Sequence, residues 1–102
     1  MIIKRLDGLT IDENWRFCLS KEERAKFGNS LIIMGSKDKL LLLTEQEWQE
    51  LENKTLLGLK GQEFRKSKRA LGNSAFVQPI DKKGRLLIPE KLRSKIKQKS
   101  SF

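Results

Sequence analysis

An internal repeat constrains this 102-residue chain more than any other feature of its sequence. Residues 11–20 match residues 80–89 at a constant offset of 69, and the match continues to Arg24 over Arg93. Each copy has an isoleucine, an aspartate, three further residues, an arginine and three largely apolar residues. A single D-x-x-x-R would carry little weight, because its residue types are common. Two copies, each followed by a helix start, predict a duplicated strand–turn–strand–helix unit.

The segment between the two copies predicts a β-hairpin followed by helices. Residues 31–34 and 40–43 are apolar runs without alternation, which indicates two paired strands that are buried on both faces. Residues 20–23 (S-K-E-E) and 44–47 (T-E-Q-E) have the form of capping boxes and mark two helix starts. Further elements are a helix at residues 62–71, strands at 75–80 and 85–88, and a last helix from residue 90 to about 97.

The positive charge is concentrated in the second half of the chain. The whole chain carries 22 basic and 13 acidic residues, a net charge of +9. Residues 1–59 hold 9 basic and 10 acidic side chains, whereas residues 60–102 hold 13 and 3. This asymmetry favours a polyanionic partner over a merely solubilising surface. Because the sequence lacks an amphipathic segment rich in tryptophan or phenylalanine, nucleic acid is favoured over a membrane.

The composition excludes several classes of chemistry. The chain has no histidine, which excludes imidazole catalysis, Ser–His and Cys–His triads and histidine metal sites. Its single cysteine excludes an internal disulfide and any CxxC motif. No pair of carboxylates resembles a catalytic dyad, so we expect no enzyme activity, metal, cofactor or small-molecule substrate. No apolar run could span a membrane and no secretory signal is recognisable, so we expect a cytoplasmic protein.

Residues 80–93 (I-D-K-K-G-R-L-L-I-P-E-K-L-R) resemble the D-x-x-G-R-φ-φ-I-P signature of the MraZ family of AbrB-like regulators. Residues 40–43, Trp48 and Leu51 are similar as well. The resemblance implies a mixed β fold with short helices, an AbrB-like swapped-hairpin (double-split) β-barrel of two pseudo-symmetric repeats. The corresponding segments are a first repeat at residues 1–58, a helical connector at 59–74 and a truncated second repeat at 75–102.

The resemblance also implies sequence-specific binding to double-stranded DNA through the arginine of the repeated motif. The motif residues are Asp12 and Arg16 in the first copy and Asp81, Gly84, Arg85 and Pro89 in the second. A pairing of aspartate with arginine is compatible with DNA contact, because the carboxylate orients the guanidinium and leaves donors for phosphate or guanine. Basic residues in or beside turns, for which phosphate contact and a solvated surface are both open, are Lys82, Lys83, Lys4 and Arg5.

Two departures from the family pattern concern the turn of the first copy and the end of the second. Glu13, Asn14 and Trp15 stand where the family has a basic residue and glycine, which favours DNA contact through the second copy. For Trp15, exposed stacking and simple packing are equally open. Cys18 aligns with the apolar Leu87, so we expect a small buried hydrophobe there. The second copy lacks a following hairpin and helix, which indicates either a short or divergent member or an unpaired part of the second barrel.

The sequence therefore favours a regulator of MraZ type in the cytoplasm and nucleoid, acting on cell-division and cell-wall genes. An alternative is an AbrB-like antitoxin that binds DNA and a toxin, although such tails are usually acidic and residues 91–99 are basic.

The strands at residues 75–80 and 85–88 need partners for their backbone groups and cover for their apolar faces. That cover must come from the first repeat or from a neighbouring subunit. Because residues 70–102 are too few for an independent core, we expect an obligate homo-oligomer with interleaved strands, and the family resemblance implies ring-like assembly.

Overall fold

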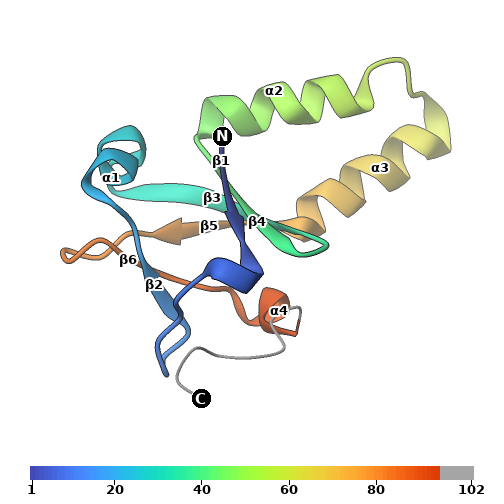
Figure 1. Cartoon of the computed structure of the whole chain (residues 1–102). Coiled ribbons are helices and arrows are strands. Elements are labelled where there is room, and N and C mark those ends of the chain that lie inside the picture. The colour runs from blue at the N-terminus through green and yellow to red at the C-terminus, as the bar shows by residue number, and fades with distance from the viewer. Residues whose placement is uncertain (95–102) are drawn as a thin grey trace.

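A four-stranded antiparallel sheet in the order β1-β4-β3-β5 lies at the centre of the molecule (Figure 1). The structure is a computed structural model and describes residues 1–94. The strands of this sheet are β1 (Ile2–Arg5), β3 (Ser30–Ser36), β4 (Lys39–Leu43) and β5 (Ala75–Pro79). A second, two-stranded antiparallel sheet, which we call the ribbon, consists of β2 (Arg16–Cys18) and β6 (Arg85–Leu87). The helices are η1 (Leu6–Gly8), α1 (Lys21–Phe27), α2 (Glu45–Leu56), α3 (Gly61–Ser74) and α4 (Glu90–Arg93).

The central strands β3 and β4 are buried on both faces, as the two non-alternating apolar runs predicted. One buried cluster joins this sheet to the ribbon and contains Ile11, Phe17, Leu19, Leu31, Ile33, Leu40, Leu42, Leu86, Ile88 and Leu92. The other cluster lies on the opposite face, where Trp48 and Leu51 of α2 pack against Ile32, Met34 and Leu43. The molecule thus has three layers, with the ribbon and the α2–α3 pair on opposite faces of the central sheet (Figure 1).

Both predicted capping boxes are confirmed. The Ser20 hydroxyl accepts a hydrogen bond from the Glu23 amide at 3.1 Å, and the Glu23 carboxylate accepts one from the Ser20 amide at 2.9 Å. Thr44 and Glu47 make the same pair of bonds at 3.1 and 3.0 Å. Each box satisfies two of the amides that a helix start leaves without a partner, and so fixes where α1 and α2 begin.

The third helix is longer than the sequence predicted. α3 continues past Leu71 to Ser74, whose hydroxyl donates to the Leu71 carbonyl at 2.9 Å. Its inward residues, Phe64 and Leu71, keep helical spacing, and the polar residues beyond them do not break the helix. The last helix begins after Pro89 as predicted; its expected end near residue 97 lies outside the described residues.

Both strands of the second repeat receive their cover from the first repeat of the same chain. β5 pairs with β3 from Ser30↔Pro79 to Met34↔Ala75, and β6 pairs with β2. The first repeat therefore supplies the backbone partners of both strands, whereas Val77 of β5 stays 71% exposed. Within residues 1–94, no helix is long and apolar enough to cross a membrane.

Candidate nucleic-acid interface

The ribbon places the two copies of the motif side by side in a symmetric register. Its paired positions are Arg16↔Leu87, Phe17↔Leu86 and Cys18↔Arg85. Shifting every residue by the repeat offset of 69 maps this set of pairs onto itself. Two further backbone bonds obey the same rule: the Leu19 amide donates to the Gly84 carbonyl, and the Ile88 amide donates to the Trp15 carbonyl, each at 2.8 Å. The two copies are thus related by an approximate twofold axis through the ribbon.

The first turn is organised by Asp12. One oxygen of its carboxylate accepts hydrogen bonds from the backbone amides of Asn14 at 2.8 Å and Arg16 at 3.0 Å. The Trp15 amide donates to the Asp12 carbonyl at 3.1 Å, and Trp15 has a positive φ of 61°. Within residues 1–94, the Arg16 guanidinium makes no hydrogen bond or ion pair with Asp12.

The second turn repeats this backbone pattern and adds a side-chain bond. The Asp81 carboxylate accepts from the backbone amides of Lys83 at 2.9 Å and Arg85 at 2.8 Å. Its other oxygen accepts from Nε of Arg85 at 2.8 Å. The amide of Arg85, assisted by its guanidinium and against the effect of partial burial, lowers the pKa of Asp81. The carboxylate in turn raises the pKa of Arg85.

The two motif arginines lie on the same face of the ribbon. Phe17 and Leu86 are buried on the inner face, so the alternation of a β-strand places Arg16 and Arg85 on the outer face. They occupy a diagonal of the antiparallel ladder, a separation of roughly 7–8 Å between strand positions. The outer face therefore presents two guanidinium groups that come from opposite ends of the chain.

The prediction that Cys18 is buried was wrong. Cys18 lies on the outer face, opposite Arg85, and is exposed. Alignment with the apolar Leu87 was misleading, because Leu87 also faces outward and is itself only half-buried.

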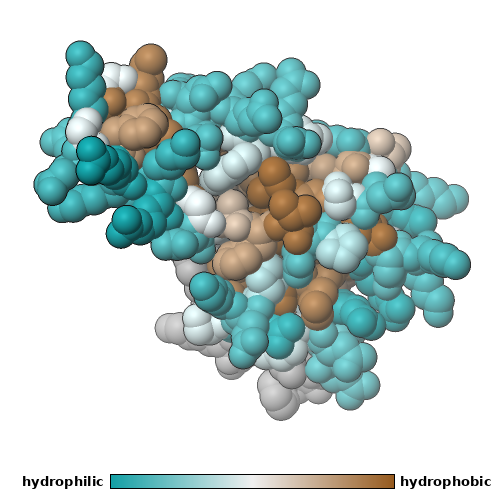
Figure 2. Space-filling view, turned by 180° about the vertical axis from the view of Figure 1, so that it is seen from behind, coloured by the Kyte–Doolittle hydropathy of each residue, from teal (hydrophilic) through white to brown (hydrophobic). Residues whose placement is uncertain are grey.

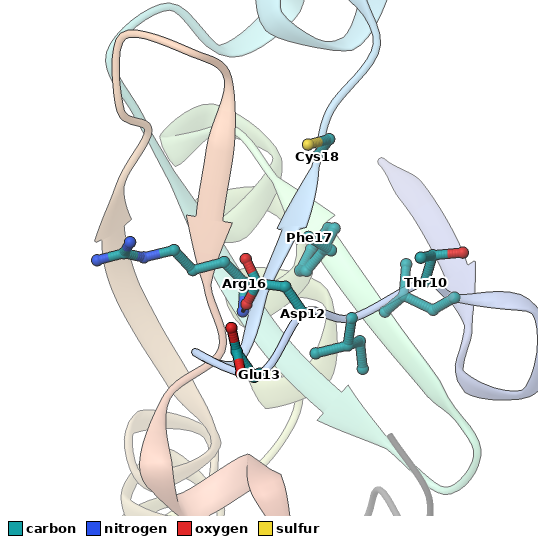
Figure 3. A pocket seen from close by; sticks show the side chains of 8 residues that line it. Thr10, Asp12, Glu13, Arg16, Phe17 and Cys18 are labelled. Atoms are coloured by element: carbon teal, nitrogen blue, oxygen red, sulfur yellow. Dashed lines mark hydrogen bonds between the residues drawn. The ribbon is translucent and has the colours of Figure 1, made fainter. Parts of the chain in front are cut away.

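A hollow of about 680 Å³ lies beside the first turn (Figure 3). Its lining comes from Leu9, Thr10, Ile11, Asp12, Glu13, Arg16, Phe17 and Cys18. Figure 3 shows the Arg16 side chain extending away from Thr10 and Cys18. By the repeat offset, residues 9–11 correspond to residues 78–80, which lie against β3 and the Asn29 carbonyl.

The basic residues selected from the sequence divide into two groups. Lys82 and Lys83 are exposed in the second turn, next to Arg85. Lys4 and Arg5 lie on β1 in the central sheet, and the structure does not place them on the ribbon. The Lys4 ammonium is paired with Glu23 of α1 at 2.5 Å. Burial acts to raise the pKa of Glu23, but the Lys4 contact and the Ser20 amide lower it overall.

Arg5 has a weaker contact than its neighbour. Its guanidinium lies 3.4 Å from the Asp7 carboxylate, and both side chains are mostly exposed. An exposed pair of this kind contributes little and leaves Arg5 available to other anions.

Two arginines outside the motif complete the site, and the sequence analysis did not select them. Arg24 of α1 donates to the Lys82 carbonyl at 3.3 Å and covers Gly84, which is buried. Arg93 of α4 places its guanidinium carbon 5.5 Å from the centre of the Trp15 ring. Trp15 is half-buried and packs against the core, so the packing alternative holds for it. The signal that could have identified these arginines was their alignment at the repeat offset.

The described residues contain no group of three or more His, Cys, Asp or Glu side chains that could hold a metal ion. The outer face of the ribbon instead carries the two motif arginines, and Lys82 and Lys83 are exposed in the adjacent second turn. Such donors bind phosphate oxygens and the acceptor edges of bases.

Comparisons with known proteins agree with the resemblance noted above. No family model matches the chain. It is 30% identical over 86 residues to the transcriptional regulator MraZ of Roseiflexus sp. (strain RS-1). It is 33% identical over 87 residues to the transcriptional regulator MraZ of Ligilactobacillus salivarius (strain UCC118). These matches cover 82% and 83% of this chain but 60% and 61% of the relatives, so the chain spans about three fifths of their length. Over the part that it shares with them, the chain belongs to the MraZ family.

Proposed function

We propose that this chain is a sequence-specific DNA-binding transcriptional regulator that contacts double-stranded DNA through the outer face of the ribbon. The observation that carries the proposal is the common outward placement of Arg16 and Arg85 on a twofold-symmetric pair of strands. A two-stranded ribbon fits the major groove, which is about 12 Å wide. The diagonal separation of roughly 7–8 Å corresponds to about two base-pair steps, so both arginines can reach base edges in one groove.

The surrounding cations are assigned to the DNA backbone. Lys82 and Lys83 flank Arg85 in an exposed turn and suit phosphate contacts, which supply affinity without sequence preference. Lys4 and Arg5 lie on another sheet, and Lys4 would have to leave Glu23 to bind a phosphate. We therefore assign these two residues auxiliary contacts at the margin of the duplex.

The assigned fold is the AbrB-like swapped-hairpin barrel of two repeats, with the first repeat at residues 1–58, a connector at 59–74 and a second repeat at 75–102. Three observations support it: β2 pairs with its own counterpart β6, β5 inserts beside β3 of the first repeat, and α3 fills most of the connector. Each repeat thus contributes strands to a core that neither forms alone.

Self-association as a homo-oligomer, with ring-like assembly, is part of the proposal. Figure 2 shows apolar side chains in the middle of one face, framed by hydrophilic ones. Val77 of β5 is 71% exposed, beside a hollow of about 610 Å³ to which Phe27, Ile32 and Trp48 also contribute. Monomers rarely expose apolar surface of this kind without a partner.

As a regulator of MraZ type, the protein would act in the cytoplasm and nucleoid on cell-division and cell-wall genes, with no membrane partner and no catalytic role. The two relatives are both named transcriptional regulators, which supports this assignment over an enzyme.

The test begins with a duplex selected from a random library by the wild-type chain. Gel-shift titrations then compare Arg16→Ala and Arg85→Ala with Arg69→Ala, an exposed arginine on α3 that lies off the ribbon. Each ribbon variant should lose about 1–3 kcal/mol per base contact and discriminate less between the selected and scrambled duplexes. Arg69→Ala should bind like the wild type. Unchanged binding by both ribbon variants would overturn the proposal.

A further inference from the structure

The two turns of the ribbon differ in what covers the fourth residue of the motif. In the second turn this residue is Gly84, and the side chain of Arg24 lies directly on it. In the first turn it is Trp15, and Arg93, the counterpart of Arg24, lies over the indole ring. Each helix that follows a motif thus sends an arginine to the turn of the other motif, but the two arginines reach different surroundings.

Arg24 is held close to the backbone of the second turn. A Cβ atom on Gly84 would lie only 2.6 Å from Cδ of Arg24, so the glycine leaves the space that the arginine occupies. Nη2 of Arg24 donates to the Lys82 carbonyl at 3.3 Å. A guanidinium has five N–H donors, and among residues 1–94 this bond is the one found for the guanidinium of Arg24. Donors therefore remain for an external acceptor next to Lys82 and Lys83.

Within residues 1–94, Arg93 makes no corresponding hydrogen bond to the backbone of the first turn. Its Nε donates to the carbonyl of Ile88, the residue that follows β6, at 3.0 Å. Its guanidinium carbon lies 5.5 Å from the Trp15 ring centre, within the range of a cation–π contact. Trp15 carries a side chain at the position where Gly84 has none, and among residues 1–94 no hydrogen bond joins the Arg93 guanidinium to the backbone of the first turn.

The charges of the two turns differ in the same direction. Residues 81–85 carry three basic side chains and one acidic, whereas residues 12–16 carry one basic and two acidic. Arg24 adds a further cation to the turn that is already basic. The positive potential that attracts phosphate is consequently concentrated at the second turn.

We propose that Arg24 is a further phosphate-contacting residue of the second turn, and that Trp15 withdraws Arg93 from the equivalent contact at the first. One chain then binds the two halves of its DNA site unequally, with one more backbone contact at the second turn. The inference rests on the proposed DNA-binding function.

The experiment measures the DNA affinity of the full chain at several salt concentrations. The logarithm of the binding constant falls as the logarithm of the salt concentration rises, and each phosphate contact makes this slope steeper by about 0.9. Arg24→Met and Arg93→Met keep an unbranched side chain over each turn and remove the charge. Arg24→Met should make the salt dependence shallower by about 0.9, and Arg24→Lys should keep the slope of the wild type. Arg93→Met should leave the slope unchanged in the wild type. In a Trp15→Gly background, Arg93 can approach the turn, so Arg93→Met should then lower the slope.

A measurement without DNA tests the structural half of the inference. In ¹⁵N-labelled protein, the Nε–H resonance of Arg93 should show a ring-current shift that Trp15→Gly removes, while the Arg24 resonance stays in place. An absent ring-current shift would overturn the placement of Arg93. Thermal melts of each variant identify loss of folding, and Arg24→Lys keeps the Arg24 assignment testable if Arg24→Met does not fold.

The failure of this inference differs from the failure of the proposed function. If Arg85→Ala weakens binding but Arg24→Met does not change the salt slope, the Arg24 assignment is wrong and the ribbon remains the interface. If Arg24→Met and Arg93→Met make the salt slope shallower by the same amount, the two turns contact phosphate equally and the inference is wrong. If the wild-type chain binds no duplex at low salt, the proposed function and this inference fall together.

Discussion

Phe17 lies directly opposite Leu86 in the β2–β6 ladder, and each is the counterpart of the other in the internal repeat. The two side chains are 2% and 0% exposed. They form the centre of the ribbon and anchor it to the core, while the residues on either side of them face outward. The placement of both motif arginines therefore depends on one buried apolar pair.

This pair should contribute strongly to stability. Phe17→Ala should cost about 3–5 kcal/mol and Leu86→Ala about 2–5 kcal/mol in the free energy of unfolding. Because the two residues are paired, the double variant should differ measurably from the sum of the single losses. Urea titrations followed by circular dichroism measure these values. Cys18→Ser, on the exposed face of the same strand, is the control and should stay within about 0.5 kcal/mol of the wild type.

Asp81→Asn should release the Arg85 side chain while keeping the turn. An asparagine oxygen can still accept from the amides of Lys83 and Arg85, but the amide nitrogen cannot accept from Nε of Arg85. We expect weaker discrimination between selected and scrambled duplexes, because the guanidinium is no longer oriented. The matched control is Asp12→Asn, since Asp12 bonds the backbone of the first turn in the same way. Equal effects of the two substitutions on discrimination would contradict this role of Asp81.

The same carboxylate predicts a pH dependence of stability. The backbone amide of Arg85 and its guanidinium lower the pKa of Asp81 in the folded chain below 3.8, its ordinary value. The folded state therefore binds this proton less readily than the unfolded state. The contribution of Asp81 is complete above pH 3.8 and is lost as the pH falls through the lower, folded value. Melting curves between pH 5 and 2 should show the wild type and Asp81→Asn converging; a constant difference would contradict the assignment.

Lys82 and Lys83 should affect DNA binding without affecting sequence preference. If each lysine contacts one phosphate, a single change to alanine should weaken binding equally for selected and scrambled duplexes. It should also make the salt dependence of binding shallower by about 0.9. Lys66→Ala on α3, which lies on another layer of the molecule, is the control. A change in the preferred sequence would instead assign the affected lysine to a base edge.

The two capping boxes should stabilise the chain to a similar degree. Ser20→Ala and Thr44→Ala each remove the side-chain acceptor for an N3 amide, at a cost of about 1 kcal/mol. Thr44→Ser keeps the oxygen and should retain most of the stability. If Ser20→Ala and Thr44→Ala melt like the wild type, other contacts determine these helix starts.

The elements that could be predicted from the sequence are those fixed by local chemistry. The capping boxes depend on two residues three positions apart, so their sequence is sufficient to place them. The apolar run at residues 31–34 indicated burial on both faces, because an amphipathic strand would alternate. The strands predicted at 75–80 and 85–88 followed from their local residue pattern, and the structure has them at Ala75–Pro79 and Arg85–Leu87.

The features that could not be predicted depend on which residues meet across the ribbon. The exposure of Cys18 follows from the direction of Phe17, and three apolar letters in a row do not reveal which one points inward. Arg24 touches a turn that lies 58 positions along the chain. Trp15 adopts a positive φ of 61°, a conformation that tryptophan rarely takes. Its alignment with Gly84 in the repeat is the one hint of this conformation in the sequence.

The pairing of β2 with β6 also determines when the outer face of the ribbon can form during synthesis. Arg16 is synthesised 69 residues before Arg85. The backbone of β2 therefore cannot pair with β6 until nearly the whole described chain has emerged from the ribosome. The entropy of closing so long a loop grows only slowly with its length, but pairing between such distant segments slows folding. A nascent chain that ends within α3 holds one of the two arginines and no ribbon to present it. Under the proposed function, a nascent chain without β6 therefore has no ribbon with which to recognise DNA.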